Sequence, residues 1–173
     1  MIRRTAVAAL ALVAALGLSA CATFTDNANA ARVGDVELAR DDLEHYVHDA
    51  LEARDSAAVP DEVSGDIYRT ILAGWIVDEL IRQYLDAEGV SVSDADRAAA
   101  AEQTDGQIAE SGATISDFLR DYEITSLAAR LAFQNHSQGG DALLQFARAQ
   151  TVYVDPVYGV WNLDSGLVEP LGS

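Results

Sequence analysis

The sequence predicts a mainly α-helical domain, built as a five-helix orthogonal array with a small two-stranded sheet joining the N- and C-terminal segments. Three observations support this fold class. Apolar residues recur at helical spacing through most of the chain between residues 40 and 149. Glycine and proline interrupt this pattern at intervals typical of helix connections. Short β-favouring runs precede the first helix and follow the last.

The first elements are a short β unit and an amphipathic helix. Residues 32–38 alternate apolar and polar side chains around Gly34-Asp35, which indicates a short strand or a tight two-stranded turn. The next helix is expected over residues 40–54. Its apolar positions follow the i, i+3, i+4, i+7, i+8 pattern of one buried face: Leu43, Tyr46, Val47, Ala50 and Leu51.

The second helix is expected to be the centre of the core. Ser64 is a suitable N-cap, and Gly89 is a suitable stop after a helix ending near Glu88. The apolar stripe between them is unusually broad, so several other elements must pack around this helix. Gly74 lies in the middle and costs about 1 kcal/mol relative to alanine. We therefore expect another element to approach the backbone closely at Gly74.

Three further helices and one strand follow. Ser93 and Asp96 have the spacing of a capping box, which predicts a third helix to about Glu110. Thr114 with Asp117 starts a fourth helix, and a fifth runs over residues 141–149. The apolar side of the fourth helix is expected to comprise Phe118, Tyr122, Leu127 and Leu131.

The two ends of the domain are expected to meet. Residues 151–154 form a β-branched and aromatic run, the clearest strand signal in the chain. Neither this strand nor the one near Val33 is long enough to be stable alone. Pairing the two would satisfy their backbone groups. Residues 157–173 are expected to form an ordered but irregular cap.

The N-terminus has the features of a bacterial lipoprotein signal. Arg3 and Arg4 precede an apolar run over residues 6–17, which is too short to span a bilayer. Leu18-Ser19-Ala20-Cys21 then resembles a lipobox, in which the cysteine thiol is acylated. We expect a signal peptide over residues 1–20, lipidation of Cys21, a flexible tether over residues 21–31 and a folded domain over residues 32–173. The expected location is the extracytoplasmic face of the cell membrane.

Charge and cysteine content exclude several functions. Beyond residue 20 the chain has 9 arginines, no lysine and 28 acidic residues, a net charge of −19. Such a charge argues against nucleic acid as a partner and against electrostatic attraction to anionic lipid. The single cysteine is used for the lipid, so neither a disulfide nor thiol chemistry is expected.

The sequence gives no indication of an enzyme. None of its serines lies in the Gly-x-Ser-x-Gly arrangement of hydrolases, and Gly139-Gly140 lacks the residues that complete a phosphate loop. His45 and His48 could together hold a metal on one helical face. A solvated acidic face is the favoured interpretation, because no further ligands stand out. We expect no cofactor and no catalytic residue.

The order and spacing of these segments resemble the N-terminal domain of SurA-type periplasmic chaperones and related foldases. The resemblance rests on residues 31–38, the acidic helix start at residues 41–44, the apolar helix and restart over residues 71–94, and residues 118–122 and 146–154. Residues 154–161 also resemble a tail seen in lipoproteins that carry this domain. The family often contains an inserted parvulin domain, for which this chain has no room, so no prolyl isomerase activity is expected.

The resemblance implies a membrane-tethered chaperone-like protein that binds unfolded or newly exported polypeptides. Its clients would occupy an apolar groove between helices, and Tyr68, Trp75 and Tyr122 are the aromatic residues chosen to line it. Trp75 is nevertheless expected to favour the core. One alternative is an envelope adaptor that uses the same fold to bind one specific partner. A weaker alternative is a metal- or ligand-binding lipoprotein. The oligomeric state is left open.

Overall fold

A computed structural model of the chain describes residues 28–54, 64–136 and 140–172. Within these ranges the mainly helical, five-helix prediction is confirmed. The helices are α1 (Arg40–Arg54), α2 (Gly65–Ala87), α3 (Asp94–Ser111), α4 (Asp117–His136) and α5 (Gly140–Ala149). The strands are β1 (Asn29–Val33), β2 (Val36–Ala39), β3 (Val152–Val154), β4 (Val160–Asn162) and β5 (Leu167–Glu169).

Helices α2 and α3 begin at the N-cap residues that the sequence predicts. The Ser64 side chain accepts a hydrogen bond from the backbone N–H of Asp66, and Ser93 with Asp96 forms the predicted capping box. The N-terminus of α4 differs from the prediction. There the Ser116 hydroxyl oxygen, and not Thr114, accepts from the backbone N–H of Leu119 at 3.0 Å. A serine two positions further along therefore sets the start of this helix.

The predicted pairing of the chain's two ends is confirmed. In the sheet β2-β1-β3, antiparallel β1 is the central strand, and Val33 lies opposite both Val36 of β2 and Val152 of β3. The sheet thus has a third strand, because the turn at Gly34 folds β2 back on β1. Strand β1 begins at Asn29, so the last three residues of the expected tether belong to the sheet, and Ala30 and Ala31 are fully buried.

The C-terminal segment is more regular than the sequence indicated. It forms an antiparallel hairpin, β4–β5, in which Trp161 lies opposite Val168. Gly159 permits this hairpin, because its φ of 137° is unfavourable for other residues and a Cβ there would collide with the carbonyl of Glu169. Val168 is buried in the main core. The expectation of an irregular cap was therefore wrong.

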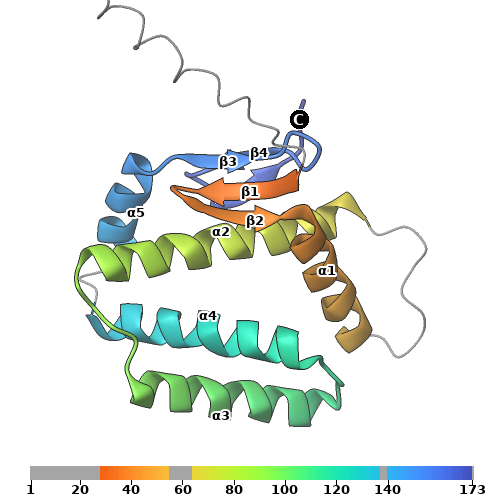
Figure 1. Cartoon of the computed structure of the whole chain (residues 1–173), viewed down its shortest axis with the longest axis vertical. Helices are drawn as coiled ribbons and strands as arrows, with labels where there is room; N and C mark the ends of the chain where they lie inside the picture. The colour runs from red at the N-terminus through yellow and green to blue at the C-terminus, as the bar shows by residue number, and fades with distance from the viewer. Residues whose placement is uncertain (1–27, 55–63, 137–139, 173) are drawn as a thin grey trace, which may run out of the picture.

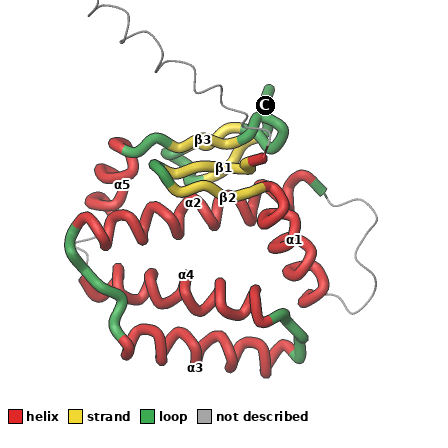
Figure 2. The backbone as a smooth tube through the Cα atoms, viewed as in Figure 1, coloured by secondary structure: helices red, strands yellow, loops and turns green. Residues whose placement is uncertain are grey.

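Helix α2 lies between two layers, as predicted from its broad apolar stripe. The sheet and α5 lie on one side of α2, and α4 followed by α3 lies on the other, with α1 crossing one end (Figures 1 and 2). The main core joins the sheet, α1 and α2, and its largest fully buried apolar side chains are Leu43, Leu72, Ile76, Val33 and Val47. A smaller cluster joins α2 to α4: Ile81, Leu85, Ala129 and Ala132.

The apolar side of α4 differs in part from the prediction. Its buried residues are Leu119, Ser126, Ala128, Ala129 and Ala132, whereas Phe118 is exposed. Small side chains thus make most of the contact, since α4 is packed between α2 and α3. Alanines carry a weak hydrophobic signal, so the sequence pattern favoured the larger residues instead.

Gly74 does not mark a close approach, contrary to the prediction. A Cβ placed on Gly74 would meet no atom within 4 Å outside its own helix. We therefore expect Gly74→Ala to raise the free energy of unfolding by about 0.5–1 kcal/mol, because alanine has the higher helix propensity. Urea denaturation measures this change. The control Gly112→Ala should instead destabilise the protein, since Gly112 has φ of 66° at the end of α3. A less stable Gly74→Ala variant would contradict the open space seen here.

Candidate functional site: a cleft between α1, α3 and α4

A hollow lies where α1, α3 and α4 meet. It has a volume of about 630 Å³, within the range of ligand-binding clefts. Its lining combines apolar and polar side chains. The apolar ones are Ala50, Ala53, Ile108, Ala113, Ile115, Leu119 and Leu127, and the polar or charged ones are Gln103, Thr104, Gln107, Ser111, Glu123 and Arg130.

A smaller space of about 140 Å³ continues the cleft towards α2. The two spaces share four lining residues: Ala50, Leu119, Glu123 and Arg130. The inner space also reaches Gly74 on α2, which explains why a Cβ would meet nothing there. The missing side chain of Gly74 therefore helps to form this space, although it was predicted to receive a neighbouring element.

A buried carboxylate lies at the inner end of the cleft. Asp78 of α2 is buried, and its Oδ1 accepts a hydrogen bond from Arg130 Nε of α4 at 2.7 Å. The Tyr122 hydroxyl lies 3.3 Å from the other oxygen. Burial, followed by the nearby Asp78 charge, raises the pKa of the Tyr122 hydroxyl far above its ordinary value. Tyr122 therefore remains protonated and can donate to Asp78, while Arg130 supplies the compensating charge.

Aromatic rings and one buried acid fix the wall between α1 and α4. Tyr46 of α1 lies against Phe118 and Tyr122 of α4, with ring centroids 4.7 and 4.6 Å apart. Asp49 is buried one turn further along α1 and accepts a hydrogen bond from the Ser116 hydroxyl. The residue that caps α4 thus also joins it to α1, so the side of the cleft formed by these helices is held in place.

The structure separates the three aromatic residues predicted to bind clients. Tyr122 lines the inner part of the cleft. Trp75 is only 6% exposed and belongs to the main core, as its position among apolar neighbours suggested. Tyr68 is half-buried and packs on Tyr158, with ring centroids 5.7 Å apart. Cys21, the predicted lipidation site, lies outside the described residues.

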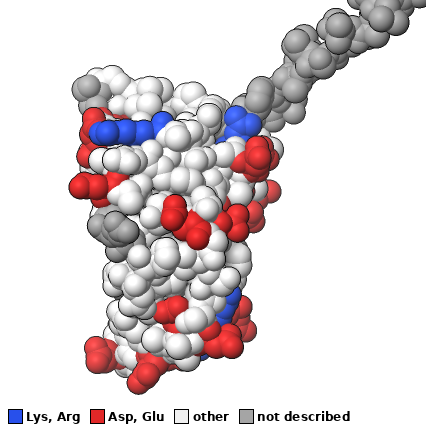
Figure 3. Space-filling model, turned by 90° about the vertical axis from the view of Figure 1, so that its left-hand side faces the viewer, with Lys and Arg blue, Asp and Glu red and all other residues white. Residues whose placement is uncertain are grey.

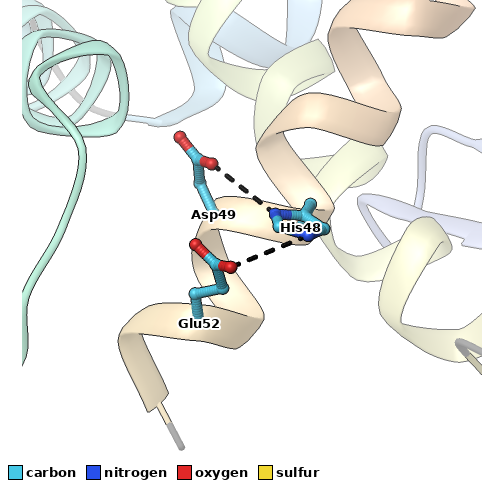
Figure 4. A group of neighbouring side chains, drawn as sticks. All are labelled: His48, Asp49 and Glu52. Atoms are coloured by element: carbon cyan, nitrogen blue, oxygen red, sulfur yellow. Dashed lines mark ion pairs between the residues drawn. The ribbon is translucent and has the colours of Figure 1, made fainter. Parts of the chain in front are cut away.

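The two histidines of α1 do not combine into one group. His48 lies with Asp49 and Glu52, its Nδ1 3.9 Å from one carboxylate and its Nε2 3.8 Å from the other (Figure 4). His45 instead packs edge-on against Phe118, with Nε2 3.5 Å from Asp49. His48 and Glu52 are exposed, and Asp49 is engaged with Ser116. This arrangement is that of surface ion pairs, which contribute little to stability.

Sequence reasoning missed most of the cleft. Its lining includes several alanines and two glutamines, and these residue types give no periodic or motif signal. The usable signals were the isolated Gly74 and the acidic pair Asp78-Glu79, which follows the apolar run of residues 75–77 in the middle of the helix. A buried aspartate requires a partner, which in the structure is Arg130 of α4.

Comparison with known proteins gives no match: no family profile, no curated protein and no solved structure is significantly similar to this chain. Within residues 28–54, 64–136 and 140–172, none of the helices combines the length and the hydrophobicity needed to cross a bilayer.

Proposed function

We propose that the chain is a membrane-tethered, extracytoplasmic chaperone-like lipoprotein that binds unfolded or newly exported polypeptides without prolyl isomerase activity. The observation that carries this proposal is the cleft between α1, α3 and α4, with its mixture of apolar and amide-bearing side chains. The lipobox ending at Cys21 and the resemblance of the sequence to SurA-type chaperones support the same function.

The lining of the cleft suits an unfolded segment. An extended chain presents apolar side chains together with unpaired backbone N–H and C=O groups. Ile108, Ile115 and Leu119 offer apolar contact, while Gln103 and Gln107 each carry an amide that donates and accepts hydrogen bonds. Such contacts depend little on the client's sequence. A volume of about 630 Å³ accommodates a few side chains at a time, which favours weak and reversible binding.

Two substitutions that fill the cleft test the proposal. Gly74→Leu adds a side chain to the inner space, and Ala53→Phe adds a ring at the end of α1. We expect each to weaken binding of a fluorescent unfolded polypeptide about tenfold, equivalent to about 1.4 kcal/mol. Matched controls on α3 make the same exchanges away from the cleft: Gly106→Leu and Ala109→Phe. Gly106 has open space around it and Ala109 is exposed, so both should bind normally.

Fluorescence anisotropy and suppression of aggregation are the two measurements. Equal binding by cleft-filling and control variants would reject the cleft as the client site. An intact protein that binds no unfolded polypeptide, yet captures one folded envelope protein at fixed stoichiometry, would favour the adaptor alternative. Thermal melts of all four variants separate lost binding from lost folding.

The anchor is tested separately by Cys21→Ala. Acylation requires the thiol of this cysteine, the only one in the chain. We expect the variant to incorporate no labelled palmitate and to accumulate as an uncleaved precursor or a released protein. Metabolic labelling and membrane fractionation measure both effects. Continued incorporation of labelled fatty acid would refute the lipobox interpretation.

A further inference from the structure

The exposed apolar side chains of this protein are concentrated near its C-terminal hairpin. Six large apolar residues are exposed in the described chain, and four of them lie between residues 157 and 171. Their exposed fractions are 69% for Val157, 49% for Val160, 54% for Leu167 and 64% for Leu171. We call these four residues the hairpin patch. Apolar clusters that remain exposed commonly mark a surface that contacts a partner or a membrane.

The hairpin register places two of the four residues, Val160 and Leu167, on one outer face. Trp161 and Val168 are opposite each other and face the core, so their neighbours Val160 and Leu167 point outward. Val160 is opposite Glu169, and Val157 and Leu171 extend beyond this pair at the same end of the hairpin. The hairpin patch thus comprises Val160 and Leu167 on the outer face of β4–β5, Val157 in the turn before β4 and Leu171 in the turn after β5.

The N-terminal end of the fold emerges beside this patch. The backbone N–H of Asp155 donates to the carbonyl of Ala30 at 2.9 Å, and the Asp155 carboxylate accepts from the N–H of Val157 at 2.9 Å. The start of β1 is therefore next to the turn that carries Val157.

Two of the acidic groups near the patch, Asp155 and Glu169, have partners. Asp155 forms an ion pair with Arg40 at 2.5 Å, and Glu169 accepts a hydrogen bond from Asn162 at 2.8 Å. On the face drawn in Figure 3, acidic side chains lie along most of the length of the molecule, and only the extreme end at the sheet is largely uncharged. On this face, the extreme sheet end is therefore the part that an anionic surface repels least.

The length of the preceding chain sets how far this end can lie from an anchor. Cys21 precedes Ala28, the first described residue, by seven positions. Seven residues span at most about 25 Å even when fully extended. With lipid attached at Cys21, the start of β1 is thus held within about 25 Å of the bilayer, and the turn that carries Val157 lies beside it. A short linker gives the tethered domain a high effective concentration at the bilayer surface. Even weak contacts between the domain and the bilayer are therefore populated.

We propose that the hairpin patch rests on the lipid bilayer, with its valine and leucine side chains entering the headgroup region. This inference rests on the lipid anchor of the proposed function. Contact through the sheet end directs the opposite end, formed by α3 and α4, away from the membrane (Figure 1). The cleft between α1, α3 and α4 would then face the compartment that exported polypeptides enter. Lipidation and the hairpin patch together would set the orientation of the protein.

Site-directed fluorescence on the full lipidated protein tests the orientation. Acylation of Cys21 leaves an introduced cysteine as the only free thiol. Val157→Cys and Leu171→Cys place an environment-sensitive dye in the patch, and Ala109→Cys places it at an exposed site on α3. Each protein is added to vesicles of phosphatidylethanolamine and phosphatidylglycerol that contain nitroxide-labelled lipid. We expect strong quenching and a blue shift at positions 157 and 171, and neither at position 109.

The other outcomes overturn the inference in distinguishable ways. Equal and weak quenching at all three positions, in protein that floats with the vesicles, would leave the anchor intact and reject contact through the patch. A blue shift at positions 157 and 171 that depends on protein concentration and ignores lipid quencher would assign the patch to a second copy of the chain. Protein that fails to float would reject the lipid anchor itself, and with it the orientation.

Discussion

Replacing Trp75 with alanine is expected to lower the free energy of unfolding by about 3–5 kcal/mol. Trp75 is 6% exposed in the middle of α2 and belongs to the core cluster that also contains Leu43 and Ile76. Its removal leaves a large cavity between α2 and its neighbours, because the surrounding helices and sheet cannot all collapse into it. Urea denaturation monitored by circular dichroism measures the loss.

Two comparisons make the Trp75 prediction specific. Trp75→Phe retains much of the ring and should cost less than Trp75→Ala. Val157→Ala removes methyl groups from an exposed side chain and should change stability by no more than about 0.5 kcal/mol. A small loss of stability in Trp75→Ala would contradict the prediction. If this variant also bound an unfolded polypeptide more weakly, Trp75 would be assigned to the client site and not to the core.

Truncation after Gln138 is expected to abolish cooperative folding of the whole domain. It removes α5, β3, β4 and β5, and with them the pairing between β1 and β3. Val154 and Val168 leave the main core, and burial of these two side chains alone contributes about 3–6 kcal/mol. This is comparable to the total stability of many domains. We expect the thermal transition to be lost or strongly broadened.

Truncation after Pro170 is the matched control. It removes the exposed residues Leu171 and Gly172 together with Ser173 and leaves the β4–β5 pairing intact, so the melting temperature should stay close to that of the untruncated chain. If the protein truncated after Gln138 melted at that same temperature, the C-terminal segment would be an appendage and the sheet would not require β3.

The helices were predictable because their signals are local. Ser64 and Gly89 bound α2 in the sequence and in the structure, and Ser93 with Asp96 bounds the start of α3 in the same way. The β1–β3 pairing followed from a different requirement, since two short strands needed partners. The β4–β5 hairpin was missed because each strand has three residues, too few to display alternation.

The candidate site was less accessible to sequence reasoning than the fold. Tyr122 was selected for its amphipathic side chain and lines the inner cleft, but Tyr68 and Trp75, chosen on the same ground, lie elsewhere. Residue type alone does not reveal which helices face each other. Gly74 shows the difficulty most directly: the same glycine was consistent with a tightly packed neighbour and with an open space, and the structure has the open space.

The pairing of β1 with β3 also governs the order in which this protein can fold. Ala31 and Val154 are partners across the sheet although more than a hundred residues separate them in the chain. When the chain is synthesised from its N-terminus, β1 therefore lacks its β3 partner until almost the whole chain has been made. Contacts of such high sequence separation slow folding, because a long loop must close before they form. We expect this protein to complete its fold later and more slowly than a simple helical bundle of the same size.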